Sequence, residues 1–228
     1  MRTKRFYGRF RAHWILSSRS RMKISYAITV CNEYEEIQKL ISTLFAHSRE
    51  EDEIVVLFDK KAGTPQVWNY LVDLQKEDWI RAYPKTFKNH FADWKNHLNS
   101  LCTGDYIFQI DADEVPNVKL IETLPSLLEG NSSIDLFLVP RVNTVEGLTD
   151  EHISKWRWNV NDKGWVNWPD YQMRLYRNSD DIVWQNKVHE VITNTNTHTE
   201  LPMNENFALY HPKEIKRQEK QNEYYSTL

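Results

Sequence analysis

The feature that most constrains this chain is an alternation of short apolar runs with helical stripes over residues 24–110. Four runs of apolar and β-branched residues are typical of buried parallel strands: 24–31, 53–58, 79–83 and 106–110. Three stretches with apolar residues three and four positions apart predict the intervening helices: 37–45, 65–74 and 91–102. We expect Gly104 to end the last of them. The alternation predicts an α/β fold with a Rossmann-like, mostly parallel sheet flanked by helices.

The second half of the chain is less regular. We expect a helix over 117–129 and short strands at 134–139, 171–176 and 207–210. Residues 141–168 are dense in Trp, Asn and Asp and lack clear periodicity, and a charged helical tail begins at Lys213. No linker separates two folding units, so the sequence predicts one domain over 23–228.

Residues 1–22 form a basic arm that we expect to be flexible. Residues 1–21 contain seven Lys or Arg and no acidic residue, although the whole chain carries a formal charge of −3. The arm is either a solvated tail or a peripheral contact with acidic lipid head groups. The acidic body argues against a nucleic-acid partner.

Two further features bear on where the chain works. No apolar run approaches the roughly 20 residues that span a bilayer. Cys31 and Cys102 are the only cysteines, which is too few for a disulfide framework in a chain of 228 residues. We therefore expect a reducing, cytoplasmic setting.

The most informative segment is the cluster of carboxylates directly after the apolar run 106–110. Asp111 and Asp113 stand at positions i and i+2, which on an extended segment project to the same side. Ligands of open α/β sheets bind at the carboxyl ends of strands. Two such carboxylates can hold Mg²⁺ or Mn²⁺, which neutralises the charge that develops on a departing diphosphate. The alternative is that both residues only cap the next helix or lie in a polar loop.

Several motifs, in the expected order, resemble family 2 glycosyltransferases. Those of the first half are Ile28-Thr29-Val30-Cys31-Asn32-Glu33, the strand 52–59 ending in Asp59, Phe91-Ala92 with Lys95-Asn96, and Asp111-Ala112-Asp113-Glu114. Those of the second half are similar to the branch that includes lipopolysaccharide-core glucosyltransferases: Pro169-Asp170-Tyr171-Gln172, Arg174-Leu175-Tyr176-Arg177, Val188-His189-Glu190 and His211. One motif departs from the family, because the loop after Asp59 lacks the usual second Asp.

The resemblance implies a GT-A fold and a metal-dependent, inverting transfer of a sugar from a nucleotide-sugar donor. We expect a UDP-sugar as the donor and a saccharide or glycan as the acceptor. The residues that would surround the nucleotide are Thr29, Asn32, Glu33 and Asp59. Asp111 would face the ribose or share the metal, and Asp113 and His211 would hold Mn²⁺ or Mg²⁺.

Some of these residues also have a plainer interpretation. Asn32 and Glu33 would serve equally to cap the following helix. Lys95 would either contact the diphosphate or lie solvated on its helix.

Transfer to a hydroxyl needs a base that takes its proton. The resemblance favours Glu190 for this role, whereas Asp170 would orient the acceptor or simply end its loop. The tryptophans before Asp170 would either stack against a sugar or anchor a long loop on the core: Trp156, Trp158, Trp165 and Trp168.

Three other function classes compete with an active transferase. The first is a non-catalytic carbohydrate-binding protein on a degenerate glycosyltransferase fold, which the missing Asp favours. The second is a nuclease-like protein that uses the basic arm, and the acidic body argues against it. The third is a sugar nucleotidyltransferase, for which the chain lacks a Gly-rich phosphate loop near its start.

Overall fold

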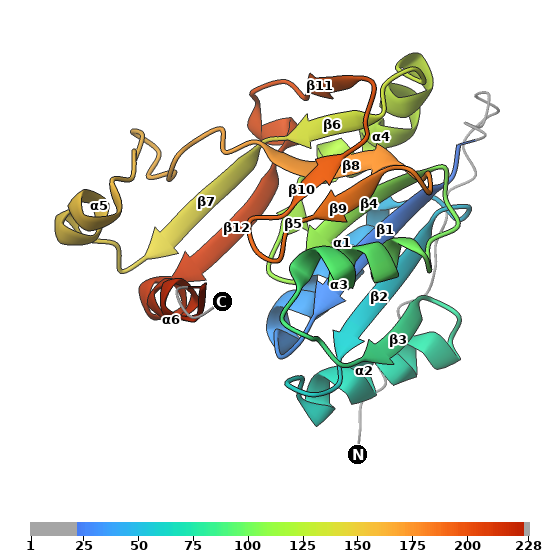
Figure 1. Cartoon of the computed structure of the whole chain (residues 1–228), viewed down its shortest axis with the longest axis horizontal. Helices are drawn as coiled ribbons and strands as arrows, with labels where there is room; N and C mark the ends of the chain where they lie inside the picture. Colours follow the sequence, from blue (N-terminus) through green and yellow to red (C-terminus); the bar gives the residue numbers. More distant parts are fainter. Residues whose placement is uncertain (1–21, 226–228) are drawn as a thin grey trace.

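The core of the protein is a seven-stranded sheet, seen here in a computed structural model that describes residues 22–225 (Figure 1). Its strands follow the order β11-β6-β8-β4-β1-β2-β3. The four strands of one half are parallel: β1 (Ile24–Val30), β2 (Glu53–Asp59), β3 (Arg81–Lys85) and β4 (Tyr106–Asp111). β8 (Gln172–Arg177) is antiparallel to both β4 and β6 (Leu136–Val139), and β11 (His198–Glu200) is parallel to β6. The predicted α/β fold with a mostly parallel sheet is confirmed.

Helices and a hairpin cover the two faces of this sheet. Alternate residues of a strand point to opposite faces, so Tyr26 of β1 packs in one core cluster and Ala27 in the other. The first face carries three helices: α1 (Tyr34–His47), α2 (Pro65–Lys76) and α4 (Val118–Gly130). The second face carries α3 (Phe91–Asn99) and the hairpin of β9 (Val183–Gln185) and β10 (Val191–Thr193).

A smaller sheet of three strands, in the order β5-β12-β7, extends from the main one. Its strands are β5 (Val115–Pro116), β7 (Arg141–Glu146) and β12 (Leu209–Glu214). β7 and β12 run side by side toward α5 (Asp150–Trp156) and α6 (Ile215–Tyr225) (Figure 1). Their parallel register places His211 opposite Asn143. The short 3₁₀ turn η1 (Glu205–Phe207) leads into β12.

The segment 141–168, expected to be irregular, contains both β7 and α5. The strand that β7 pairs with along its whole length is β12, which lies far along the chain, so the local sequence of β7 does not indicate a strand. α5 begins at a cap rather than at an apolar stripe, since the Thr149 hydroxyl accepts from the His152 amide.

Two further expectations are corrected. The last strand is not 207–210 but Leu209–Glu214, so His211 lies inside a strand instead of after one. Gly104 does not end helix α3, which stops at Asn99. A Cβ at Gly104 would lie 2.7 Å from the Ser25 nitrogen, so the glycine permits close approach to β1.

The arm predicted at 1–22 lies, except for Met22, outside the described residues. Within the described part of the chain, none of the helices is both long enough and apolar enough to cross a membrane.

Candidate active site

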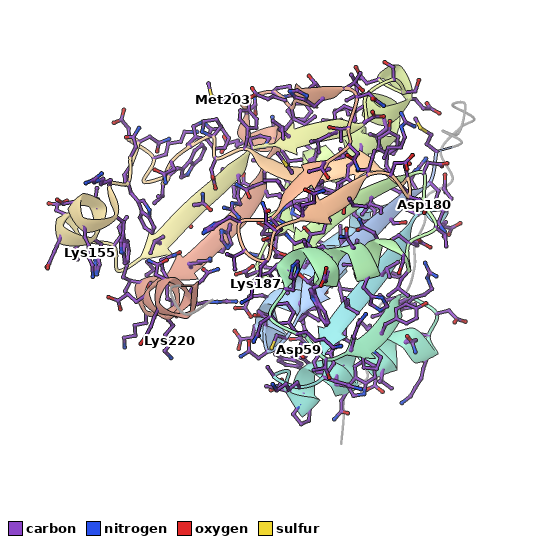
Figure 2. The ribbon with its side chains drawn as sticks, viewed as in Figure 1. Asp59, Lys155, Asp180, Lys187, Met203 and Lys220 are labelled. Atoms are coloured by element: carbon purple, nitrogen blue, oxygen red, sulfur yellow. The ribbon has the colours of Figure 1, made fainter. Side chains whose placement is uncertain are left out.

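A cleft of about 1090 Å³ opens where strands β1, β2 and β4 end. Its far wall comes from β12, α6 and the loop before β8. In Figure 2 the labelled Asp59 marks the β2 side of this cleft and Lys220 the α6 side. The structure gathers every residue predicted for the site into its lining: Thr29, Asn32, Glu33, Asp59, Lys95, Asp111, Asp113, Asp170, Glu190 and His211.

Asp111 is the last residue of β4, and both of its carboxylate oxygens are already engaged. Oδ1 accepts from the Thr29 hydroxyl and from the Gln109 amide, each at 3.0 Å, and Oδ2 accepts from Arg174 Nη2 at 2.5 Å. Burial alone would raise the pKa of Asp111, but the charges of Arg174 and Lys95 outweigh it and hold the pKa well below the ordinary value. Asp111 is therefore a fixed anion at the floor of the cleft.

Asp113 faces His211 across the cleft, with 3.4 Å between Oδ2 and Nε2. The amide group of Asn143 sets the tautomer of that imidazole. Its Nδ2 donates to Asp170 at 2.6 Å, so its Oδ1 must accept from His211 Nδ1, which lies 2.8 Å away. In the neutral imidazole the proton is then on Nδ1, and Nε2 turns its lone pair toward the carboxylate.

In that tautomer Asp113 Oδ2 and His211 Nε2 are both acceptors, so a proton or a cation must lie between them. Burial raises the pKa of Asp113, but when Nε2 carries the proton, the hydrogen bond and charge of the His211 imidazolium lower it to about 2 overall. Asp113 and His211 together offer two ligands for a divalent ion. No group of three His, Cys, Asp or Glu side chains in the described residues is arranged to hold a metal. Mg²⁺ in particular is commonly held by one or two protein carboxylates together with substrate phosphates.

Glu190 lies in the loop of the hairpin, directly before β10, and forms a partly buried ion pair with Lys95, whose Nζ is 2.5 Å from Oε1. The Lys95 ammonium also lies 4.3 Å from the centre of the Trp184 ring. The alternative of a solvated Lys95 is wrong, because this side chain is only 5% exposed. In the described part of the chain, Lys95 is the single ionic partner of Glu190.

Asp170 is held much more tightly. Its Oδ2 accepts from Arg141 Nη2 at 2.7 Å, from Arg141 Nε at 2.9 Å and from Asn143 at 2.6 Å. Its Oδ1 accepts from the Gln172 amide at 3.0 Å. The Asp170 carboxylate thus accepts from four donor groups, whereas that of Glu190 is paired with Lys95, so the two candidate bases differ sharply in the hydrogen bonds that they can still accept.

The comparison with protein families decides what kind of cleft this is. The model of the family described as Glycosyl transferase family 2 matches residues 25–193, which is most of the chain. The chain belongs to glycosyl transferase family 2. No curated protein matches it.

Solved structures agree on the fold of this glycosyltransferase. S. aureus TarS 1–349 in complex with UDP is similar, with a TM-score of 0.61 and 15% identity over 84% of this chain and 60% of that one. TarS 1–349 in complex with UDP-GlcNAc gives a TM-score of 0.59 at 15% identity, over 84% of this chain and 59% of that one. The chain thus spans about 60% of the length of these relatives. The likeness shows that the glycosyltransferase has a GT-A fold.

The loop residues of the glycosyltransferase at the ends of β1 and β2 are held by their own backbone. Glu33 does not cap helix α1 with its side chain. Its Oε2 accepts instead from the amides of Cys31 and Asn32 at 2.8 and 3.0 Å, which fixes the β1–α1 loop. Asp59 Oδ1 accepts from two amides, at 3.0 Å from Lys61 and 3.1 Å from Phe87, which fixes the loop after β2.

The tryptophans before Asp170 divide into two pairs. Trp156 and Trp158 pack with ring centres 4.7 Å apart, and Trp158 lines the cleft. Trp165 and Trp168 pack at 4.9 Å and line a second hollow of about 480 Å³ near the exposed Met203 (Figure 2). All four are half-buried, and none of them is among the side chains that pack against the two core clusters of the described residues.

Sequence reasoning gave no role to Arg141, Arg174 and Glu114. Arg174 Nη2 contacts Glu114 Oε1 at 2.8 Å, and Arg141 Nη1 contacts the same oxygen at 2.9 Å. Arg174 and Glu114 are both buried. The sequence feature that could have indicated this role is Arg174 itself, which lies in the middle of a predicted strand. A buried Arg requires an anionic partner nearby.

Proposed function

We propose that this chain transfers a hexose from a UDP-sugar to a hydroxyl of a saccharide acceptor, with a divalent metal and with inversion. The observation that carries the proposal is the pair of facing acceptors, Asp113 and His211, in a cleft at the ends of β1 and β4. Membership of family 2 supports sugar transfer as the reaction, and this pair supports a metal-assisted donor site in the cleft. The likeness of the second-half motifs to lipopolysaccharide-core glucosyltransferases makes a glycan acceptor of that kind the first to test.

The donor would lie along the ends of β1 and β2. Thr29, Asn32, Glu33 and Asp59 line the cleft there and would surround the nucleotide, and Asp111 would face its ribose. Lys95 lies close enough to Asp111 to lower the pKa of that carboxyl, which supports a contact between this cation and the diphosphate. Structures of TarS hold UDP and UDP-GlcNAc, which supports a uridine nucleotide as the first choice.

Mn²⁺ or Mg²⁺ fits the Asp113–His211 pair, because a cation would satisfy two acceptors that otherwise face each other. When bound, the ion neutralises charge on the departing diphosphate. Asp113 and His211 would hold it, and Asn143 keeps the His211 lone pair aimed at it.

Glu190 would be the base. It has one oxygen paired with Lys95 and the other available to the acceptor hydroxyl. Asp170, held by Arg141 and Asn143, would accept a hydrogen bond from the acceptor and orient it. A single displacement by that hydroxyl inverts the anomeric centre, which is the stereochemistry we propose.

The setting of the reaction stays a prediction. We propose a cytoplasmic enzyme, for which the two free thiols of Cys31 and Cys102 are the supporting observation. Contact of the basic arm with a membrane surface is proposed on its charge alone.

Calorimetric titration with a panel of nucleotide sugars tests the proposal, with Mn²⁺, with Mg²⁺ and with a chelator. Asp113→Ala should weaken metal-dependent donor binding by about 100-fold, because the carboxylate is one of two protein ligands. The matched control is Asp73→Ala, which removes an exposed carboxylate on α2 and should bind as wild type does. Absence of donor binding by wild type under every metal condition would refute the proposal and favour a carbohydrate-binding protein.

A further inference from the structure

A continuous line of charged side chains crosses the floor of the cleft from Asp111 to Asp170. Arg174 Nη2 contacts Asp111 Oδ2 at 2.5 Å and Glu114 Oε1 at 2.8 Å. Arg141 then contacts the same Glu114 oxygen at 2.9 Å and Asp170 Oδ2 at 2.7 Å. The line therefore joins the carboxylate expected at the donor to the one expected at the acceptor.

This line begins where the backbone pairing of β4 and β8 ends. The ladder runs from Tyr106 opposite Arg177 to Phe108 opposite Leu175 and goes no further. Beyond it, Arg174 Nη1 donates to Gln109 Oε1 at 2.7 Å, so side chains replace the ladder. Arg174 is thus inserted between two strands that separate as they approach the cleft.

Stability alone is a poor reason for such an arrangement. The Arg174 side chain is 5% exposed and Glu114 is fully buried, and the Arg174 Nε has no partner in the described residues. Burying charges carries a desolvation cost, and well-packed apolar side chains often stabilise a fold equally well or better. The strands could pair here with apolar residues, as they do at Phe108 and Leu175.

The two arginines fix the orientation of the carboxylates that they contact. A guanidinium is a planar fork that fixes the direction of a carboxylate, which an ammonium does not. Because Arg174 and Arg141 share one oxygen of Glu114, a shift of either Arg displaces the partner of the other.

We propose that Arg174 is a positioning residue of the transfer reaction, which through Glu114 and Arg141 holds Asp111 and Asp170 as one rigid unit. The inference rests on the proposed function, since it assigns Asp111 to the donor and Asp170 to the acceptor. It predicts that donor binding depends on the shape of the Arg174 side chain and not only on its charge.

Arg174→Lys tests this, since it keeps the charge and removes the fork. The matched control is Arg177→Lys on the same strand, which loosens an ion pair with Asp135 outside the cleft. UDP and GDP, each with Mn²⁺, are titrated by calorimetry into wild type and both variants, and thermal unfolding is recorded for all three. We expect Arg174→Lys to weaken binding of the nucleotide that wild type prefers by about tenfold or more, with stoichiometry near one. Arg177→Lys should bind as wild type does.

The stoichiometry separates positioning from folding, because partly misfolded protein lowers the number of sites and not their affinity. Wild-type affinity in Arg174→Lys would overturn the inference, as would an equal loss of affinity in Arg177→Lys. If Arg174→Lys does not fold, Arg141→Lys takes its place: it lies two contacts from Asp111, and unchanged nucleotide affinity would overturn the inference there. Failure of wild type to bind either nucleotide would instead refute the proposed function itself.

Discussion

Two networks of charged side chains lie at opposite ends of the same parallel strands. At the amino ends, Glu53 Oε1 accepts from the Ser25 hydroxyl and the Thr103 amide, each at 2.6 Å. Its Oε2 accepts from Lys23 and Arg81, each at 2.7 Å. At the carboxyl ends, Asp111 and Asp113 lie in a network that borders the cleft. The first network closes on itself, whereas the second has side chains that a ligand can reach.

The comparison shows that a lowered pKa does not by itself identify a functional carboxylate. Burial raises the pKa of Glu53, and hydrogen bonds from Lys23, Ser25 and Thr103 more than offset it, so the pKa falls to about 2. The pKa of Asp113 is also lowered to about 2, in its case by His211. What distinguishes the two is the cleft beside Asp113 and the imidazole Nε2 of His211 that faces it there.

The largest expected effect is a loss of kcat at the carboxyl ends of the strands, where the network borders the cleft. Glu190→Gln should lower kcat by about 10³-fold, because it removes the proposed base and keeps its shape. Asp170→Asn, measured in parallel with a transferable acceptor, should mainly raise KM, because Asp170 orients the acceptor. A larger loss of kcat in Asp170→Asn than in Glu190→Gln would reverse the assignment of the base.

A change in the network around Glu53 should lower the stability of the fold and leave nucleotide binding unchanged. Glu53→Gln should lower the free energy of unfolding by about 1–2 kcal/mol, because it leaves the half-exposed Lys23 and Arg81 without their anion. Urea unfolding measures this, and nucleotide affinity by calorimetry should stay at the wild-type value. A loss of nucleotide affinity larger than unfolded protein explains would show that the Glu53 network also affects the cleft.

The dependence of stability on acidic pH tests the structural role of Glu53 in a second way. Because the pKa of Glu53 is depressed to about 2 from an ordinary 4.5, its contribution to stability is complete above pH 4.5. It is lost as the pH falls toward 2, when the folded protein takes up the proton. Unfolding measured at pH 6 and pH 3 should therefore show a smaller decrease in Glu53→Gln than in wild type, and an equal decrease would contradict the assignment.

The smallest effect is expected at the rim of the cleft. Arg217 on α6 lies 3.3 Å from both Asp113 and Glu33, with a side chain that is 36% exposed. A guanidinium that shares the Asp113 carboxylate competes with a bound cation. Arg217→Gln should therefore tighten Mn²⁺ binding about threefold in nucleotide-free protein, as the modest strength of exposed ion pairs requires. Weaker Mn²⁺ binding in this variant would show that Arg217 supports the metal instead.

The sequence by itself determined the first half of the fold and the place of the candidate site. Buried parallel strands appear as apolar runs, and helices as stripes three and four residues apart, so β1, β2 and β4 and their helices were readable locally. Asp111 ends β4 and Asp113 comes two residues later, and a strand end is where an α/β site is expected. Those patterns are local, so no partner needed to be known.

Only the tertiary structure decided which side chains meet. His211 reaches Asp113 from 98 residues away, because β12 pairs with β7 and with β5. Arg174 reaches Asp111 from 63 residues away, at the point where β4 and β8 separate. Neither contact leaves a periodic trace in the sequence, because a hydrogen bond between distant segments constrains two single residues and not a repeating face.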